Sequence, residues 1–199
     1  MFKKKIKIIS IPPKSENPYL DLFYNALALY DMERINSLKY DVSLISKFSA
    51  EFDAVHFHWP EYYWRSFNTK AVNTLNNNIP KFWRFKGVIG IFFFFFETLS
   101  LIKKRKPIIW TVHNLFPHER YNRFERSAFK WLARISDMLL FHSESSMKAF
   151  DKIFKSKSNA SKIIMYIGNY KNYYPDPNPR ETVLDNLGLA PDLPVVSLI

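Results

Sequence analysis

Residues 107–119, P-I-I-W-T-V-H-N-L-F-P-H-E, hold four polar side chains that could do chemistry within one short stretch. The apolar run 108–112 predicts a strand that is buried on both faces. Ligands of open α/β sheets bind beyond the carboxyl ends of the strands, so polar groups placed there favour a ligand site. The structural alternative is that they only cap the strand and that residues 117–119 begin the next helix. The polar side chains that follow the strand are His113, Asn114, His118 and Glu119.

Two further predicted strands also end in histidine. Residues 52–59, F-D-A-V-H-F-H-W, run into Pro60 and Glu61, and residues 138–141 run into His142 and Ser143. The carboxyl ends of parallel strands meet at one edge of a sheet, so we expect five of these side chains along that edge. They are His58, His113, Asn114, His118 and His142.

His56 and His58 lie two residues apart on a predicted strand, and strand alternation places them on the same face. Such a pair could ligate a metal, but the spacing of the sequence places no further ligand beside it. The alternative is an ordinary buried strand whose last histidine reaches the cleft. We therefore expect no metal site.

Strand-like and helix-like patterns alternate along the whole sequence. This order predicts an α/β fold with a Rossmann-like parallel sheet and helices on both faces. The expected strands are residues 5–11, 41–46, 52–59, 108–112, 138–141 and 162–167. The expected helices are one that starts at Pro18 with Asn17 as its N-cap, then 82–106, 119–135, 144–154 with Ser143 as its cap, and 179–187.

The composition narrows the function classes. The 199 residues are 47% hydrophobic, which is typical of a globular protein, and they include no cysteine, which excludes disulfides and thiolate metal sites and fits a reducing compartment. No G-x-G-x-x-G, G-x-x-x-x-G-K-[ST] or G-x-S-x-G is present, which argues against a phosphate-cradling loop and a hydrolase nucleophile elbow. The net charge of +11 attracts anionic partners.

Two predicted helices could meet a membrane surface. The run 88–96, V-I-G-I-F-F-F-F-F, is too short to span a bilayer, so it forms either a core helix or an interfacial one. The helix expected at 119–135 has a stripe of five positive charges, which is either a solvated face or a site for an anionic partner. A membrane fits such a stripe better than nucleic acid does, because the sequence has no nucleic-acid recognition motif. The stripe consists of Arg120, Arg123, Arg126, Lys130 and Arg134.

Several of these motifs together resemble the N-terminal domain of bacterial GT-B glycosyltransferases of the family 4-like type. The most specific one is the run W-T-V-H-N-L-F-P-H-E at 110–119, and the resemblance covers nearly the whole chain. The chain departs from the family pattern at Ile167, where relatives commonly have a histidine. The other motifs are residues 52–60, Ser136-Asp137 with His142-Ser143, Asn17-Pro18-Tyr19 and Gly168-Asn169-Tyr170.

The resemblance implies two Rossmann-like domains that face each other across a cleft, without a metal. Residues 1–172 would be the N-terminal acceptor domain, 173–192 a linker, and 193–199 the start of a truncated C-terminal donor domain. This domain would bind no cofactor, because the nucleotide-sugar donor belongs to the missing C-terminal domain. His113 is then the candidate catalytic residue. The candidate substrate-binding residues are Asn17, His58, Trp59, Glu61, Asn114, His118, Glu119, His142, Asn169 and Tyr170.

The expected function is transfer of a sugar to a membrane-proximal or lipid-linked glycan during polysaccharide synthesis. The expected location is cytoplasmic, with peripheral attachment to the inner face of the plasma membrane as an option. Because the donor half is expected to be missing, the isolated fragment should be inactive. The alternative is a noncatalytic basic α/β module that binds anionic membrane or nucleic acid.

Overall fold

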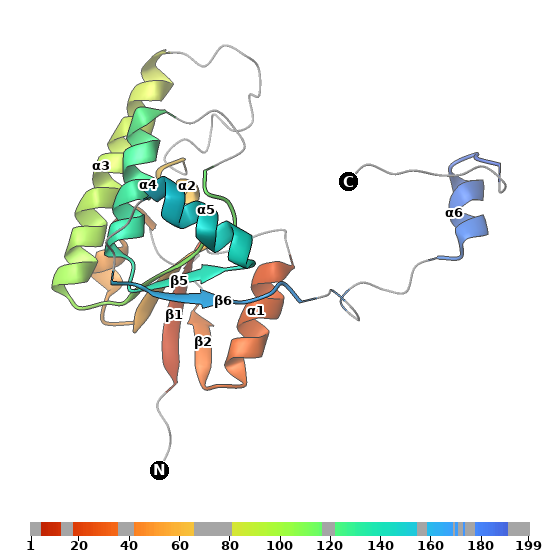
Figure 1. Ribbon diagram of the computed structural model, residues 1–199, viewed down its shortest axis with the longest axis horizontal. Coiled ribbons are helices and arrows are strands. Elements are labelled where there is room, and N and C mark those ends of the chain that lie inside the picture. The colour runs from red at the N-terminus through yellow and green to blue at the C-terminus, as the bar shows by residue number, and fades with distance from the viewer. Residues whose placement is uncertain are drawn as a thin grey trace. The chain divides into compact units, whose positions relative to one another are not determined.

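The computed structural model describes residues 5–12, 18–35, 42–65, 81–116, 122–154, 159–168, 170, 173 and 178–190. The chain divides into two units, Met1–Tyr166 and Ile167–Ile199, and each is described by itself. Figure 1 shows the first unit as a sheet with helices packed against it.

The first unit contains a six-stranded sheet in the order β2-β1-β3-β4-β5-β6. All five strand pairs are parallel, so the predicted α/β fold class is confirmed. The central strands are buried on both faces, because they lie between two layers of helices. The strands are β1 (Ile6–Ile11), β2 (Met32–Ile35), β3 (Ala54–Phe57), β4 (Ile108–Thr111), β5 (Met138–Phe141) and β6 (Ser161–Ile164).

The two faces of the sheet carry different layers (Figure 1). One face forms the larger core with α2 (Glu61–Arg65), α3 (Lys81–Lys103), α4 (Arg123–Ile135) and α5 (Glu144–Phe154). The other face is covered by α1 (Tyr19–Ala28), which buries Tyr19, Leu20 and Tyr24 against Ile8 and Ala54. Since strand residues alternate between faces, neighbours such as Ala54 and Val55 belong to different layers.

The predicted strand at residues 41–46 is wrong. Residues 42–48 form a 3-10 helix, η2 (Val42–Phe48), and the strand beside β1 is β2. The backbone of Ser46 finds its partners on α3: its N–H donates to Glu97 Oε2 at 2.7 Å, and its carbonyl accepts from Lys104 Nζ at 2.6 Å. These tertiary contacts replace a strand ladder. Residues 32–35 read M-E-R-I, too short and too polar to stand out as a strand.

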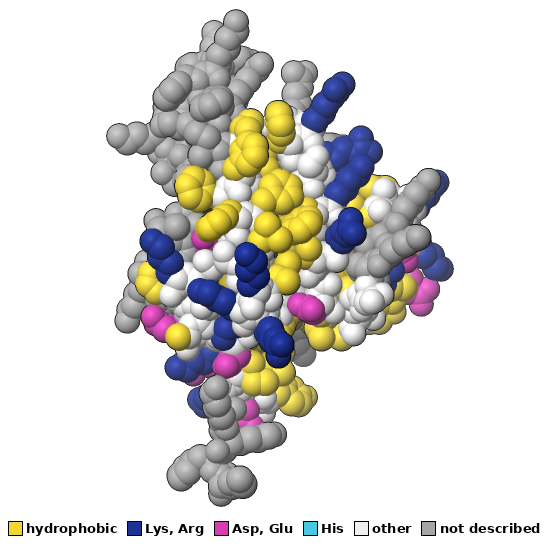
Figure 2. Space-filling view, turned by 90° about the vertical axis from the view of Figure 1, so that its left-hand side faces the viewer, with side chains coloured by type: hydrophobic (Ala, Val, Ile, Leu, Met, Phe, Trp, Pro, Cys, Tyr) yellow, Lys and Arg dark blue, Asp and Glu magenta, His cyan; other side chains and the backbone are white. Residues whose placement is uncertain are grey.

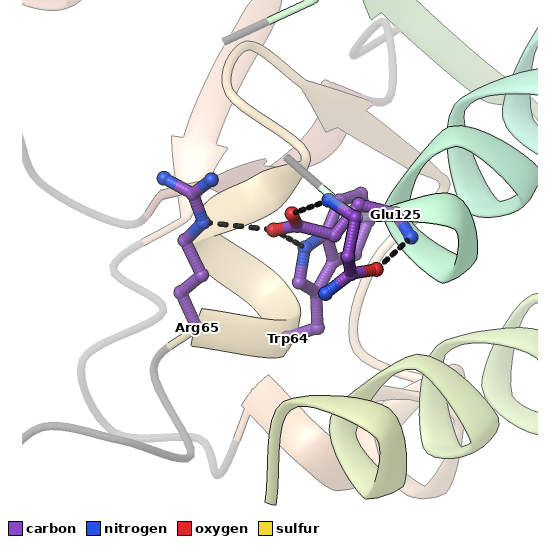
Figure 3. Close-up of polar contacts among 4 residues, drawn as sticks. Trp64, Arg65 and Glu125 are labelled. Carbon is purple, nitrogen blue, oxygen red and sulfur yellow. Dashed lines mark hydrogen bonds and ion pairs between the residues drawn. The ribbon is translucent and has the colours of Figure 1, made fainter. Parts of the chain in front are cut away.

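The helix predicted from residue 119 is described from Arg123, and residues 117–121 lie outside the described residues. Its start is fixed by a capping box. Asn122 Oδ1 accepts from the Glu125 N–H, and Glu125 Oε2 accepts from the Asn122 N–H. The same carboxylate also accepts from Trp64 Nε1 at 3.0 Å and from Arg65 Nε at 2.9 Å, both on α2. Figure 3 shows the two side chains directed at Glu125. Glu125 therefore stabilises both the start of α4 and its contact with α2.

The second unit contains α6 (Arg180–Asn186), close to the predicted helix at 179–187. The helix ends in a Schellman motif: the Gly188 N–H donates to the Asp185 carbonyl and the Leu189 N–H to the Leu184 carbonyl. Gly188 has φ +64°, a conformation that glycine adopts without strain. Residues 193–199, expected to begin a donor domain, lie outside the described residues.

Candidate active site at the carboxyl edge of the sheet

Strands β3, β4 and β5 end side by side, and each is followed by a histidine. The register pairs Phe57 with Trp110 and Thr111 with Leu140, so the residues that follow leave the sheet at the same edge. His58 Nδ1 lies 3.3 Å from His113 Nε2, and His113 Nδ1 lies 3.3 Å from His142 Nε2. Three histidines from separate parts of the sequence thus form a continuous row.

The row extends into a larger hydrogen-bonded group on the α1 face of the sheet. The hydroxyl of Tyr24 lies 3.0 Å from His56 Nδ1 and 3.1 Å from His58 Nε2. His56 Nε2 in turn lies 2.8 Å from Thr111 Oγ1. We call this group the histidine network. Its members in order are Thr111, His56, Tyr24, His58, His113, His142 and the main-chain carbonyl of Met165, which lies 2.9 Å from His142 Nδ1.

Aromatic rings enclose the exposed end of the histidine network. Trp59 stacks on His113 with a centroid distance of 4.5 Å and an interplanar angle of 10°. Tyr19 from α1 meets the edges of His58, His113 and His142 at 5.8, 4.9 and 5.4 Å. His113, His142 and Trp59 are only partly buried, so this end of the network borders solvent.

Burial keeps the inner histidines neutral. Burial, with a smaller contribution from the nearby His113, lowers the pKa of His56 to about 3. Burial and then the proximity of His142 lower the pKa of His113 to about 3. Burial, followed by repulsion from His56 and His113, lowers the pKa of His58 well below its usual range. A neutral imidazole keeps one lone pair, so it can accept a proton or a hydrogen bond.

The structure brings three of the five predicted edge residues together: His58, His113 and His142. Asn114 follows His113 at this edge and is exposed, and Glu61 opens α2. Tyr170 belongs to the second unit. The predictions for Asn17, His118, Glu119, Arg120 and Asn169 lie outside the described residues.

Sequence reasoning missed two members of the histidine network, Tyr24 and Thr111, and took His56 for an ordinary buried residue. Helical spacing places Tyr24 with the apolar residues of α1, so the sequence pattern does not single it out. A buried tyrosine hydroxyl usually finds a hydrogen-bond partner, and that rule is the signal that could have pointed to it. Among the described residues, no group of three or more histidine, cysteine, aspartate or glutamate side chains is placed to hold a metal ion.

Part of the chain is similar in sequence to an enzyme that transfers a sugar. No family model matches the chain. The chain is 28% identical over 128 residues to a GDP-mannose:glycolipid 4-beta-D-mannosyltransferase of Xanthomonas campestris pv. campestris, and the same match recurs in a second strain. The match covers 63% of this chain but only 30% of that relative.

Solved structures show the same fold. Anabaena Alr3699/HepE in complex with UDP-glucose has a TM-score of 0.50 and 14% identity, over 94% of this chain and 50% of that one. The same protein in complex with UDP has a TM-score of 0.46 over 92% of this chain. The chain thus spans about half the length of these structures. The Rossmann-like fold is shared with HepE, and the sequence similarity is to a glycosyltransferase.

Proposed function

We propose that this chain is the acceptor-binding half of a glycosyltransferase that transfers a sugar from a nucleotide-sugar to a membrane-proximal or lipid-linked glycan in polysaccharide synthesis. The observation that carries the proposal is the row of His58, His113 and His142 at the carboxyl edge of a parallel sheet, where ligands of such sheets bind. The named substrates of the mannosyltransferase relative, GDP-mannose and a glycolipid, support this substrate class.

The chemistry of the site fits a hydroxyl acceptor. His113 is neutral and partly exposed, so one of its ring nitrogens can accept a hydrogen bond or a proton from a sugar hydroxyl. Trp59, stacked beside it, and Asn114 offer an aromatic surface and an amide for the same sugar. The nucleotide-sugar would be held by a second domain outside residues 1–172, so residues 1–199 alone should not transfer sugar.

The test is a transfer assay on the full-length protein. A panel of nucleotide-sugars that starts with GDP-mannose and UDP-glucose is offered with alkyl glycosides of short oligosaccharides as acceptors. We expect transfer from one donor, and His113→Ala should lower turnover by about 10²- to 10⁴-fold, the range for general acid–base groups. Lys152→Ala, at an exposed position of α5, is the control. No transfer from any donor contradicts the proposal, and turnover by residues 1–199 contradicts the assignment of the donor to another domain.

We further propose that the partner surface is an anionic membrane that meets the outer face of α3. Phe92 and Phe96 are 68% and 64% exposed there, whereas Phe94 is fully buried in the core. Leu99 and Ile102 continue the exposed apolar strip along the helix. Figure 2 shows this hydrophobic patch with Lys and Arg side chains on both sides. Among the described residues, no helix is both long enough and apolar enough to cross a membrane.

The basic side chains of α4 would be attracted to an anionic membrane. Four of the five predicted stripe residues are described, and all four are exposed on α4: Arg123, Arg126, Lys130 and Arg134. Helices α3 and α4 pack together, with Trp131 Nε1 donating to Thr98 Oγ1 at 2.9 Å. Each basic residue near an anionic surface contributes about 1 kcal/mol. The stripe therefore gives reversible binding, and the exposed phenylalanines add an apolar contribution.

Sedimentation with vesicles separates the two contributions. Anionic phosphatidylglycerol vesicles should bind more protein at low salt than neutral phosphatidylcholine vesicles, because salt screens exposed charges beyond about 10 Å at 0.1 M. The triple variant R123E/R126E/K130E should abolish this difference, whereas F92S/F96S should remove the binding that persists in high salt. The control is K148E/K152E, which reverses two exposed cations of α5. Equal binding to both vesicle types at low salt would refute the membrane surface.

A further inference from the structure

Each hydrogen bond of the histidine network has a donor and an acceptor that can be assigned from the chemistry of the groups. A main-chain carbonyl can only accept, so His142 must carry its proton on Nδ1 to donate to Met165. A neutral imidazole has one N–H, so His142 Nε2 is an acceptor. His113 must then donate from Nδ1 to His142, which leaves His113 Nε2 as an acceptor for the proton on His58 Nδ1.

The same logic continues into the buried half of the network. His58 Nε2 is left as an acceptor, so the hydroxyl of Tyr24 donates to it. The oxygen of Tyr24 then accepts from His56 Nδ1, and His56 Nε2 accepts from the hydroxyl of Thr111. Six hydrogen bonds are made by six protons, and every histidine has its proton on Nδ1.

We infer that Tyr24 is a positioning residue that, with the carbonyl of Met165, holds all four histidines in the Nδ1–H tautomer. Only a hydroxyl can accept from His56 and donate to His58 at the same place. Both histidines are 1% exposed and Tyr24 is 6% exposed, so the residues around the hydroxyl leave no opening to bulk water. Phenylalanine would leave two buried ring nitrogens without their partner.

One neighbour competes for the proton of Tyr24. The side chain of Ser10 also lies within hydrogen-bonding range of the phenol, but its own hydroxyl donates to the carbonyl of Pro12 at 2.8 Å. If Tyr24 gave its proton to Ser10, the lone pair of His58 Nε2 would face only the oxygen lone pairs of the phenol. An unpaired buried acceptor costs free energy, so donation to His58 is the arrangement that satisfies every group.

The consequence for the site rests on the proposed function. The two histidine–histidine contacts, at 3.3 Å, are the longest in the network and lie at its solvent end. A hydroxyl of the sugar acceptor could insert between the rings of His58 and His113. It would accept a hydrogen bond from His58 Nδ1 and donate one to His113 Nε2. When its O–H bond breaks, Nε2 of His113 gains the proton, and His113 passes its Nδ1 proton to Nε2 of His142. The positive charge then rests on His142, at the partly exposed end.

Nitrogen NMR tests the inference without any substrate. In protein labelled with ¹⁵N-histidine, long-range proton–nitrogen correlations at neutral pH distinguish Nδ1–H from Nε2–H for each ring. We expect the Nδ1–H pattern for His56, His58, His113 and His142. Finding Nε2–H at His58 or His113 in the unmodified protein overturns the inference.

Two variants locate the role of the hydroxyl. Tyr24→Phe should end the single Nδ1–H pattern of His56, because that ring is ordered through the hydroxyl of Tyr24, whereas His113 and His142 should keep theirs from the carbonyl of Met165. Thr111→Val should perturb His56 alone. If Tyr24→Phe leaves the tautomer of His56 unchanged, Tyr24 does not position that ring. Should Tyr24→Phe fail to fold, the unmodified protein and Thr111→Val still decide the direction of the network. Because the spectra need no sugar, a failed transfer assay refutes the proposed function and leaves the tautomer result standing.

Discussion

Adjacent residues of the same strands meet very different surroundings on the two faces of the sheet. On the face covered by α2 to α5, Phe57 and Trp110 enter a core of aromatic and aliphatic side chains. On the face covered by α1, His56 and Thr111, one residue away along the same strands, enter a hydrogen-bonded network. Successive side chains of a strand point to opposite faces of the sheet, so a substitution at one residue changes only one of the two layers.

The two faces depend on different conditions. Burial of apolar surface on the α2–α5 face has no protonation requirement. The network on the α1 face is satisfied only while its histidines stay neutral, since a second proton on any ring removes an acceptor. One layer can therefore secure the fold while the other responds to protons and ligands.

The largest expected effect is that of acid, which should destabilise the α1 face and leave the packing of the α2–α5 face unchanged. The pKa of His56 and His113 is about 3 in the folded protein, and that of His58 is also lowered. Their stabilisation is fully present above the unfolded pKa of about 6.5 and is lost as pH falls from there towards 3. We expect roughly 2 kcal/mol lost for each of His56 and His113 between pH 7 and 5, with a further loss from His58, measured by urea unfolding. An unfolding free energy that does not fall over this interval would contradict the neutral network.

Trp110→Ala should have the next largest effect, because it empties space in the apolar core where the side chain packs on Phe129 and Phe150. Large aromatic truncations of this kind cost about 3–5 kcal/mol. The loss should be the same at pH 7 and pH 5, so the variant shifts the stability curve without changing its slope. Phe96→Ala, at an exposed position of α3, is the control and should stay within about 0.5 kcal/mol. A loss that depends on pH would mean that the faces are coupled.

A pair of substitutions at neighbouring positions tests whether the two faces are independent. Thr111→Val takes the donor from His56 on the polar face, and Val112→Thr buries a hydroxyl on the apolar face. Each should cost about 1–3 kcal/mol, the usual penalty for an unpaired buried polar group. Only Thr111→Val should alter the histidine NMR spectrum. If Val112→Thr altered it as well, the two faces would not be independent.

The smallest expected effect belongs to the surface outside both layers. Charge reversal at Arg126 should change the free energy of unfolding by less than about 0.5 kcal/mol, because the side chain is exposed. The matched change Arg65→Glu should cost more, since Arg65 donates to the buried carboxylate of Glu125 (Figure 3). Equal losses in thermal unfolding would show that the Glu125 contact contributes nothing.

Local sequence patterns were sufficient for most of the fold. The strand 138–141 and the helix 144–154 have the bounds that the sequence predicts, and Ser143 Oγ caps that helix by accepting from the Ser146 N–H. Apolar runs, cap residues and helical spacing are properties of neighbours in sequence, so they can be read without a structure. The same holds for the histidines that follow three strands, because parallel strands end at a common edge.

Long-range contacts decided the rest. The sequence alone could not show that the backbone of Ser46 pairs with Glu97, or that residues 32–35 rather than 41–46 extend the sheet. It also could not show that Tyr24 lies between His56 and His58, because that depends on how α1 crosses the strands. A hydrogen bond needs two groups within about 3 Å, and for groups some 30 residues apart only the packed structure sets that distance.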